Sequence, residues 1–80
     1  MEQEVMVKLT ELLAQFQVEP GQVSGDATFE ALGLDSLDVV ELSVKIEDAY
    51  GIDIEESDLK DVQTVGDAVR VVVGKAGARA

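Results

Sequence analysis

The sequence contains neither cysteine nor histidine, and both absences restrict its chemistry. Without cysteine the chain can form no disulfide bond, offer no thiolate nucleophile and bind no metal through sulfur. Without histidine it lacks the commonest general base and the commonest metal ligand. We therefore expect no catalytic triad and no typical zinc site, and an enzyme is the class of protein that this composition favours least.

Basic residues are also scarce, because six Lys and Arg stand against 17 Asp and Glu, for a formal net charge of −11. Such a surface repels nucleic-acid phosphates and anionic membranes, and it attracts basic protein surfaces or cations. The sequence lacks an apolar run of about 18 residues, so we expect no membrane span, and its acidic start is unlike a signal peptide. These features predict a cytoplasmic, monomeric protein of 80 residues that forms one domain, 1–80.

Apolar residues make up 46% of the chain and recur at helical spacing, which predicts an all-α fold. Pro20 and Gly21 are expected to end the first helix, and Gly51 suits the residue after the second. We predict helices over roughly 3–17, 36–50 and 56–60, and a last helix that begins behind Thr64 and buries residues as far as Val73.

Residues 18–34 are predicted to form a long first loop that packs over the bundle through its own apolar residues. It is expected to contain a helical turn after Thr28, with an extra helix as the alternative. Residues 75–80 have nothing to pack against and are expected to fray. The predicted architecture is therefore a small bundle of three main helices plus one short helix, with a long first loop.

The predicted helix 36–50 carries two apolar stripes when its residues are placed at steps of about 100°. The stripe expected to face the core consists of Val39, Leu42, Ile46, Ala49 and Tyr50. The nearly opposite stripe consists of Leu37, Val40 and Val44, interleaved with Glu41, Glu47 and Asp48. An exposed apolar stripe edged by acids indicates a docking surface, although such residues also occur on helix faces that bind nothing.

Ser36 stands at the first turn of this helix, in the stretch GLDSLDVVE. Asp35 can cap the helix and Asp38 can complete a capping box, which leaves the Ser36 hydroxyl free. A helix N-terminus also favours a phosphate group, and the acid-edged stripe begins one residue later. Ser36 is therefore either a capping residue or an alcohol that another enzyme phosphorylates or esterifies.

The stretch LGLDSLDVVELSVKIEDAYGIDI resembles the core of acyl carrier proteins. The resemblance extends to ATFEALGLDSL upstream, to IDIEESDLKDVQTVGDAV downstream, and to the length and acidity of the chain. It implies that a separate phosphopantetheinyl transferase attaches a 4′-phosphopantetheine arm to Ser36, and that the arm carries acyl chains as thioesters. The cofactor would then supply the sulfur that the chain lacks, and the chain would be a carrier with no catalytic residue or metal site of its own.

The same resemblance implies a recognition face for partner enzymes, formed by Asp35, Leu37, Asp38, Val40, Glu41, Val44, Glu47 and Asp48. Partners such as acyltransferases and ketosynthase-type enzymes would present basic patches, which speed encounter and release. The family also holds acyl chains between its helices. The residues implied here are Val39, Leu42, Ile46, Ile54, Leu59 and Ala68, for each of which a plain core role is an equal alternative.

Two types of carrier fit the sequence. The acidity and the stretch DSLDVVEL resemble free-standing carriers of fatty-acid synthesis, whereas GLDSL followed by YGIDI also resembles discrete carriers of polyketide or other secondary-metabolite pathways. Val44 and Lys45 depart from the fatty-acid type. Two further classes stay open: an acidic interaction module without a prosthetic group, and a calcium-binding module, whose EF-hand loop around Gly51 would lack two of the required oxygen ligands.

Overall fold

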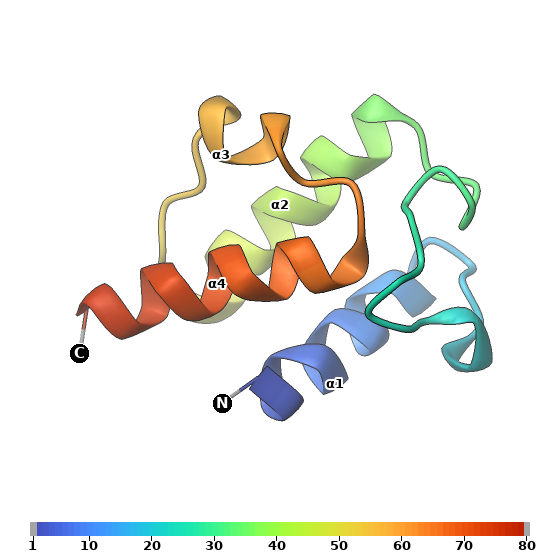
Figure 1. Cartoon of the computed structure of the whole chain (residues 1–80), viewed down its shortest axis with the longest axis horizontal. Coiled ribbons are helices and arrows are strands. Elements are labelled where there is room, and N and C mark those ends of the chain that lie inside the picture. Colours follow the sequence, from blue (N-terminus) through green and yellow to red (C-terminus); the bar gives the residue numbers. More distant parts are fainter. Residues whose placement is uncertain (1, 80) are drawn as a thin grey trace.

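Four α-helices and a short 3-10 turn form the architecture of the computed structural model, which describes residues 2–79. The elements are α1 (Glu2–Ala14), η1 (Pro20–Gln22), α2 (Ser36–Tyr50), α3 (Glu56–Lys60) and α4 (Val65–Arg79). Figure 1 shows α4 lying between α1 and α3, with α2 behind it and the long first loop at the right. Between residues 2 and 79 the only β feature is an isolated bridge that joins Thr28 to Thr64. The all-α prediction, with three long helices and one short one, is confirmed.

The core lies where α1 packs against α4 and α2. Val18, Phe29 and Leu34 complete it, so the first loop is anchored by apolar side chains as predicted, and Ile52 joins the core from the connection after α2. Burying one large aliphatic side chain contributes about 1.5–3 kcal/mol. The most deeply buried large side chains are Val5, Leu9, Leu13, Leu42, Val65 and Val72.

The first helix ends at Ala14, earlier than the predicted Gln17. Gln17 takes the left-handed conformation with a φ of 68°, and its N–H donates to the Ala14 carbonyl at 3.1 Å. The Val18 N–H then reaches back to the Leu13 carbonyl at 3.2 Å. This pair of bonds is a Schellman motif, which terminates the helix before Pro20 is reached.

The inner stripe of α2 needs one correction, because Ala49 is exposed. Ser43, which we did not predict, is buried with 6% of its surface exposed, and its Oγ donates to the Val40 carbonyl at 2.6 Å. A serine tolerates this position because its own helix satisfies the hydroxyl. The other members of the stripe are buried or half-buried as predicted: Val39, Leu42, Ile46 and Tyr50.

The first loop contains the helical turn that we predicted after Thr28. The Leu32 N–H donates to the Thr28 carbonyl at 3.1 Å, and the Thr28 Oγ1 accepts from the Ala31 N–H at 3.1 Å. Gly33 then takes a φ of 83°, which glycine adopts without strain. Residues 18–34 contain η1 and this turn, but they do not contain the extra helix that was the alternative prediction. The turn leads the chain directly to the start of α2.

Main-chain hydrogen bonds hold the first loop against the start of α4. The Val65 N–H donates to the Ala27 carbonyl at 2.9 Å, and the Gly66 N–H donates to the Gly25 carbonyl at 3.0 Å. A Cβ atom at position 66 would lie only 2.9 Å from the Gly25 oxygen. The two backbones therefore approach as closely as they do because residue 66 is glycine.

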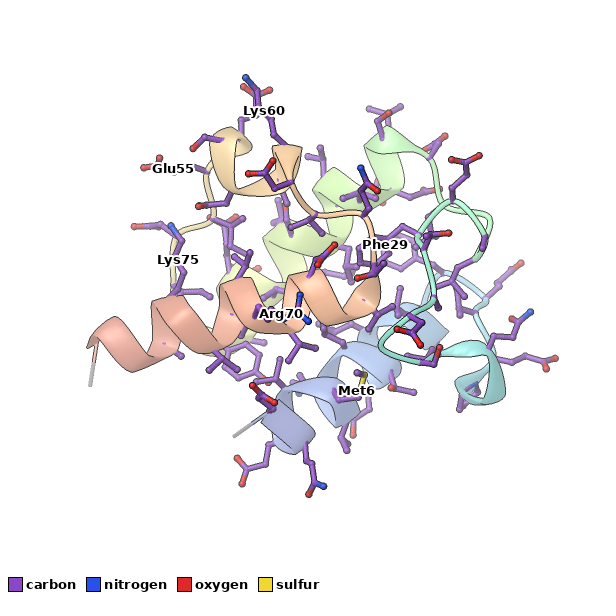
Figure 2. All side chains as sticks on the ribbon, in the orientation of Figure 1. Met6, Phe29, Glu55, Lys60, Arg70 and Lys75 are labelled. Atoms are coloured by element: carbon purple, nitrogen blue, oxygen red, sulfur yellow. The ribbon has the colours of Figure 1, made fainter. Side chains whose placement is uncertain are left out.

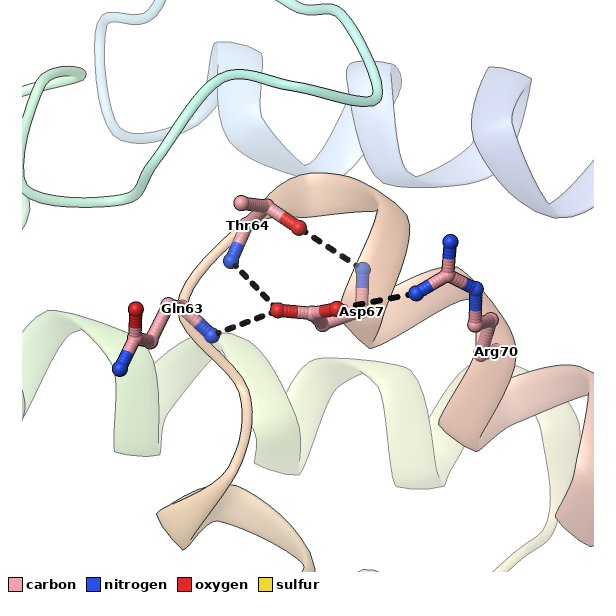
Figure 3. Close-up of polar contacts among 4 residues, drawn as sticks. All are labelled: Gln63, Thr64, Asp67 and Arg70. Carbon is pink, nitrogen blue, oxygen red and sulfur yellow. Dashed lines mark hydrogen bonds and ion pairs between the residues drawn. The ribbon is translucent and has the colours of Figure 1, made fainter.

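A capping box forms at the N-terminus of α4 (Figure 3). The Thr64 Oγ1 accepts from the Asp67 N–H at 3.1 Å, and the Asp67 carboxylate accepts from the N–H groups of Gln63 at 3.1 Å and Thr64 at 3.2 Å. Arg70 pairs with the same carboxylate at 3.2 Å. The backbone donors of Gln63 and Thr64, and the charge of Arg70, lower the pKa of Asp67.

The last helix continues beyond the point at which we expected the chain to fray, and it ends at Arg79. Lys75 Nζ lies 2.7 Å from Asp58 Oδ2 of α3, and the exposed fractions of these side chains are only 32% and 27%. Figure 2 shows Lys75 pointing from α4 toward the α3 side of the molecule. This ion pair gives the tail a partner that the sequence did not reveal. Ala80, the last residue of the predicted tail, lies outside the described residues.

Candidate functional site

Ser36 is the first residue of α2, and its side chain is exposed. The Asp35 Oδ1 accepts from the Asp38 N–H at 2.9 Å, and the Asp38 Oδ2 accepts from the Asp35 N–H at 3.2 Å. The predicted capping box therefore closes without the Ser36 hydroxyl. Its oxygen remains available for chemistry at the positive end of a helix of 15 residues.

A surface groove with about 390 Å³ of space runs beside Ser36. One wall comes from the first loop, another from the start of α2, and a third from the segment that precedes α4. Figure 2 shows Phe29 in the first loop, on the side of the loop that faces the helices. The lining of the groove includes both polar and apolar residues. These residues are Thr28, Phe29, Glu30, Leu34, Asp35, Ser36, Val39, Val62 and Gln63.

A small apolar cavity lies next to this groove, and Phe29, Val39 and Val62 line both. Its volume is about 20 Å³, room for roughly one water-sized sphere. All six residues that the resemblance implied for an acyl-binding space line it: Val39, Leu42, Ile46, Ile54, Leu59 and Ala68. The cavity is thus assembled from α2, α3, α4 and the connections around α3, but in this conformation it is too small for an acyl chain.

The outward stripe of α2 is exposed as predicted. Leu37 is 73% exposed, Val40 48% and Val44 49%, and they are three of the four exposed large apolar residues among the described side chains. Asp35, Glu41 and Asp48 are exposed, whereas Asp38 and Glu47 are half-buried. The structure therefore brings the predicted recognition residues together along one helix. We call this set of residues, from Asp35 to Asp48, the acidic face.

Glu47 makes a contact that the sequence did not predict. Its Oε2 accepts a hydrogen bond from the Ile54 N–H at 2.9 Å, across the turn that leads from α2 toward α3. Gly51, with a φ of 64°, allows this turn, and its N–H donates to the Glu47 carbonyl at 2.7 Å. Because the Ile54 side chain lines the apolar cavity, Glu47 belongs both to the acidic face and to the support of the cavity wall.

Two features are absent from the part of the chain that the structure describes. No group of three or more Asp and Glu side chains lies close enough together to hold a metal ion. None of the helices between residues 2 and 79 has the length and apolar character that crossing a lipid bilayer requires.

Comparisons with known proteins agree with this geometry. The sequence pattern of the family described as "Phosphopantetheine attachment site" matches residues 7–72. Over 78 residues the chain is 38% identical to a curated "Acyl carrier protein" from Prochlorococcus marinus (strain MIT 9515). This alignment covers 95% of this chain and 98% of that protein. The chain belongs to the acyl carrier protein family. Its fold is also similar to the crystal structure of an acyl carrier protein from Thermotoga maritima, with a TM-score of 0.90 and 25% identity over 99% of this chain and 94% of that one.

Membership of this family confirms the resemblance and the predicted cofactor, because phosphopantetheine is the group that is attached to members of this family. An acyl carrier protein serves as a carrier, and it interacts with the enzymes that synthesise and modify what it carries. The residues around Ser36 suit such a group, because an exposed serine lies beside a surface groove and the groove borders an apolar cavity.

Proposed function

We propose that the Ser36 Oγ is the attachment point of the phosphopantetheine arm. The observation that carries this proposal is the capping box of α2, which uses Asp35 and Asp38 and leaves the Ser36 hydroxyl exposed beside the groove. Ser24 and Ser57 are also exposed, but neither of them lies at the head of the acidic face. Ser36 is the serine that a docking partner would reach.

The electrostatics around Ser36 favour attachment by an enzyme over tight binding of a free phosphate. The helix N-terminus stabilises a negative group by roughly 0.3–1 kcal/mol. The carboxylates of Asp35 and Asp38 flank the same position and repel such a group. A covalent bond to the Ser36 Oγ holds the phosphodiester in spite of this repulsion, while the two carboxylates attract the basic surface of the transferase.

The chain then carries acyl groups as thioesters, since the arm supplies the thiol when it is bound. The lining of the groove includes the polar residues Glu30 and Asp35 and the apolar residues Phe29 and Val39. The apolar cavity next to it excludes water from whatever enters, because its lining residues are all apolar. An acyl chain needs more than 20 Å³, so the helices around the cavity must move apart to admit it.

The acidic face is the docking surface for the partner enzymes, which are a phosphopantetheinyl transferase, acyltransferases and ketosynthase-type enzymes with basic patches. A net charge of −11 supports fast electrostatic encounter with such patches. The acidity and the stretch DSLDVVEL favour fatty-acid synthesis as the pathway. Lys45, a base within the otherwise acidic α2, favours the alternative of a discrete carrier in a polyketide or other secondary-metabolite pathway.

The intact mass of the protein tests the attachment site. Wild type, Ser36→Ala and Ser57→Ala are each incubated with a broad-specificity phosphopantetheinyl transferase, coenzyme A and magnesium. We expect wild type and Ser57→Ala to gain the mass of one phosphopantetheine and Ser36→Ala to gain none. A gain in Ser36→Ala would move the attachment site elsewhere. No gain in folded, unmodified wild type would favour an acidic interaction module instead.

A further inference from the structure

A second surface groove lies between the N-terminal halves of α1 and α4 and contains about 290 Å³ of space. Figure 2 shows Met6 on α1 and Arg70 on α4, the two helices that form this groove. Its lining consists of Glu2, Gln3, Met6, Gly66, Val69 and Arg70. None of these residues belongs to α2, so the groove is separate from the acidic face. We call it the α1–α4 groove.

The α1–α4 groove offers apolar surface to a ligand. Val69 is buried, Met6 is half-buried, and Gly66 adds no side chain. Val7, which is 59% exposed, follows Gln3 by four residues, so helical spacing places it beside the groove on α1. Methionine adapts its shape to what it contacts and is common at binding surfaces. The groove and its margin therefore suit an apolar side chain of another protein.

The charge of the α1–α4 groove differs from that of the whole chain. The chain has 17 acids and a net charge of −11, yet the charged residues that line the groove are one acid, Glu2, and one base, Arg70. The formal charges of the lining therefore cancel. A basic partner is attracted more strongly to the acidic face, where carboxylates gather, so the α1–α4 groove is open to a partner of different charge.

Arg70 has the exposure and the free donors to bind a carboxylate. Its side chain is 78% exposed, and its Nη1 lies 3.2 Å from Asp67 Oδ1 (Figure 3). The other oxygen of that carboxylate accepts from the N–H groups of Gln63 and Thr64, which keeps Asp67 in place. A guanidinium has several N–H donors, so one bond to Asp67 leaves donors for a second carboxylate, with the planar geometry that favours paired bonds.

We propose that the α1–α4 groove is a second docking surface, and that it binds a partner protein with an acidic, apolar contact segment. The partner inserts an apolar side chain between the two helices and places a carboxylate against Arg70. Because the two surfaces share no residue, the carrier can hold one protein in this groove while an enzyme with a basic patch occupies the acidic face. The inference goes beyond the proposed function and does not depend on attachment at Ser36.

Backbone amide signals in two-dimensional NMR spectra test the groove on the full chain, before any arm is attached. Two blocked peptides serve as probes: one alternates leucine with aspartate, and the other has lysine in place of aspartate. We expect the aspartate peptide to shift the signals of Met6, Gly66 and Arg70 saturably, and the lysine peptide to shift those of Glu41 and Val44. If the aspartate peptide leaves the groove signals unmoved, or the lysine peptide shifts them as strongly, the proposal is wrong.

Two matched pairs of variants separate local charge from net charge. Arg70→Gln should weaken binding of the aspartate peptide about fivefold, near the upper end for an exposed ion pair. Lys8→Gln removes the same charge outside the groove and should leave the affinity within about twofold of wild type. Gln3→Glu and Gln15→Glu each add one negative charge at an exposed position, but only Gln3 lines the groove, so only Gln3→Glu should weaken binding. Equal losses within either pair would overturn the proposal.

Other occupants of the α1–α4 groove give different results. Octanoate, a small carboxylate with an apolar tail, tests for a small-molecule ligand, and dilution of the protein alone tests for a second copy of the chain. Octanoate that binds as tightly as the aspartate peptide, or groove signals that move on dilution without peptide, would overturn the assignment to a partner protein. A failure of attachment at Ser36 would show only in the mass measurement and would change none of these outcomes.

Discussion

Replacement of Gly66 by alanine should lower the free energy of unfolding by about 1–3 kcal/mol, although alanine is the better helix former. In the interior of an exposed helix the same change stabilises by roughly 1 kcal/mol. At position 66 the new Cβ would lie 2.9 Å from the Gly25 carbonyl oxygen, and a backbone atom cannot rotate aside. The contact forces the first loop away from α4.

The size of the loss follows from what that movement disturbs. Overpacking by one methyl group typically costs about 1–3 kcal/mol. The displaced loop also strains the hydrogen bonds from Gly66 to Gly25 and from Val65 to Ala27, each of which contributes about 1 kcal/mol. These losses exceed the propensity gain, so we expect the melting temperature to fall by about 4–8 °C for each kcal/mol lost.

Urea unfolding followed by circular dichroism measures this change, with Gly74→Ala as the matched control. Gly74 lies in the same helix, and a Cβ there meets nothing within 4 Å. Gly74→Ala should therefore stabilise the protein by about 0.5–1 kcal/mol. If Gly66→Ala were as stable as wild type while Gly74→Ala behaved as expected, the close contact between the first loop and α4 would be wrong.

Three further perturbations test other parts of the structure. Leu9 is 1% exposed, so Leu9→Ala should lower the free energy of unfolding in urea by about 2–5 kcal/mol. Leu37 is 73% exposed, so Leu37→Ala should lower it by less than about 0.5 kcal/mol. Similar losses in the two variants would contradict the packing of α1. The bond from Lys75 lowers the pKa of Asp58, so its stabilisation is present above the ordinary pKa of about 3.9 and is lost as the pH falls through the folded-state value. Thermal melts between about pH 5 and about pH 3 should thus fall more steeply in wild type than in Asp58→Asn, and parallel curves would show that the ion pair adds nothing. Sodium chloride or magnesium should raise the melting temperature, because screening relieves the repulsion within a chain of net charge −11; a lower melting temperature would argue against that repulsion.

The elements that the sequence predicted best are those with local signals. The bounds of α2 follow from Asp35, Asp38 and Gly51, which lie next to the ends that they determine. The end of α1 was predicted too late because Gln17 takes a left-handed conformation for which glycine is the usual signal. Pro20, three residues further on, predicted a later end of the helix than the structure shows.

Contacts between segments far apart in the chain could not be predicted in the same way. Nothing in the sequence around Lys75 indicates that Asp58 will lie 2.7 Å from it, and the bond between Glu47 and Ile54 depends on how the chain turns after α2. A related cause explains why Ser43 is buried on the inner face of α2 and Ala49, which was predicted to be buried, is exposed. Both lie at the margins of the stripe, where burial depends on the position of the neighbouring helices. The residues of the cavity were implied by the family resemblance, not by helical periodicity.

The extensive packing of α1 against α4 joins the first helix of the chain to the last. Figure 1 shows the two helices side by side in space, although every other element lies between them along the chain. Closing so long a loop is entropically unfavourable before native contacts form, and contacts of high sequence separation slow folding. During synthesis on the ribosome, the part of α1 that packs against α4 must therefore wait, with its apolar surface uncovered, until α4 emerges. The complete α1–α4 packing can therefore form only after α4 has been translated.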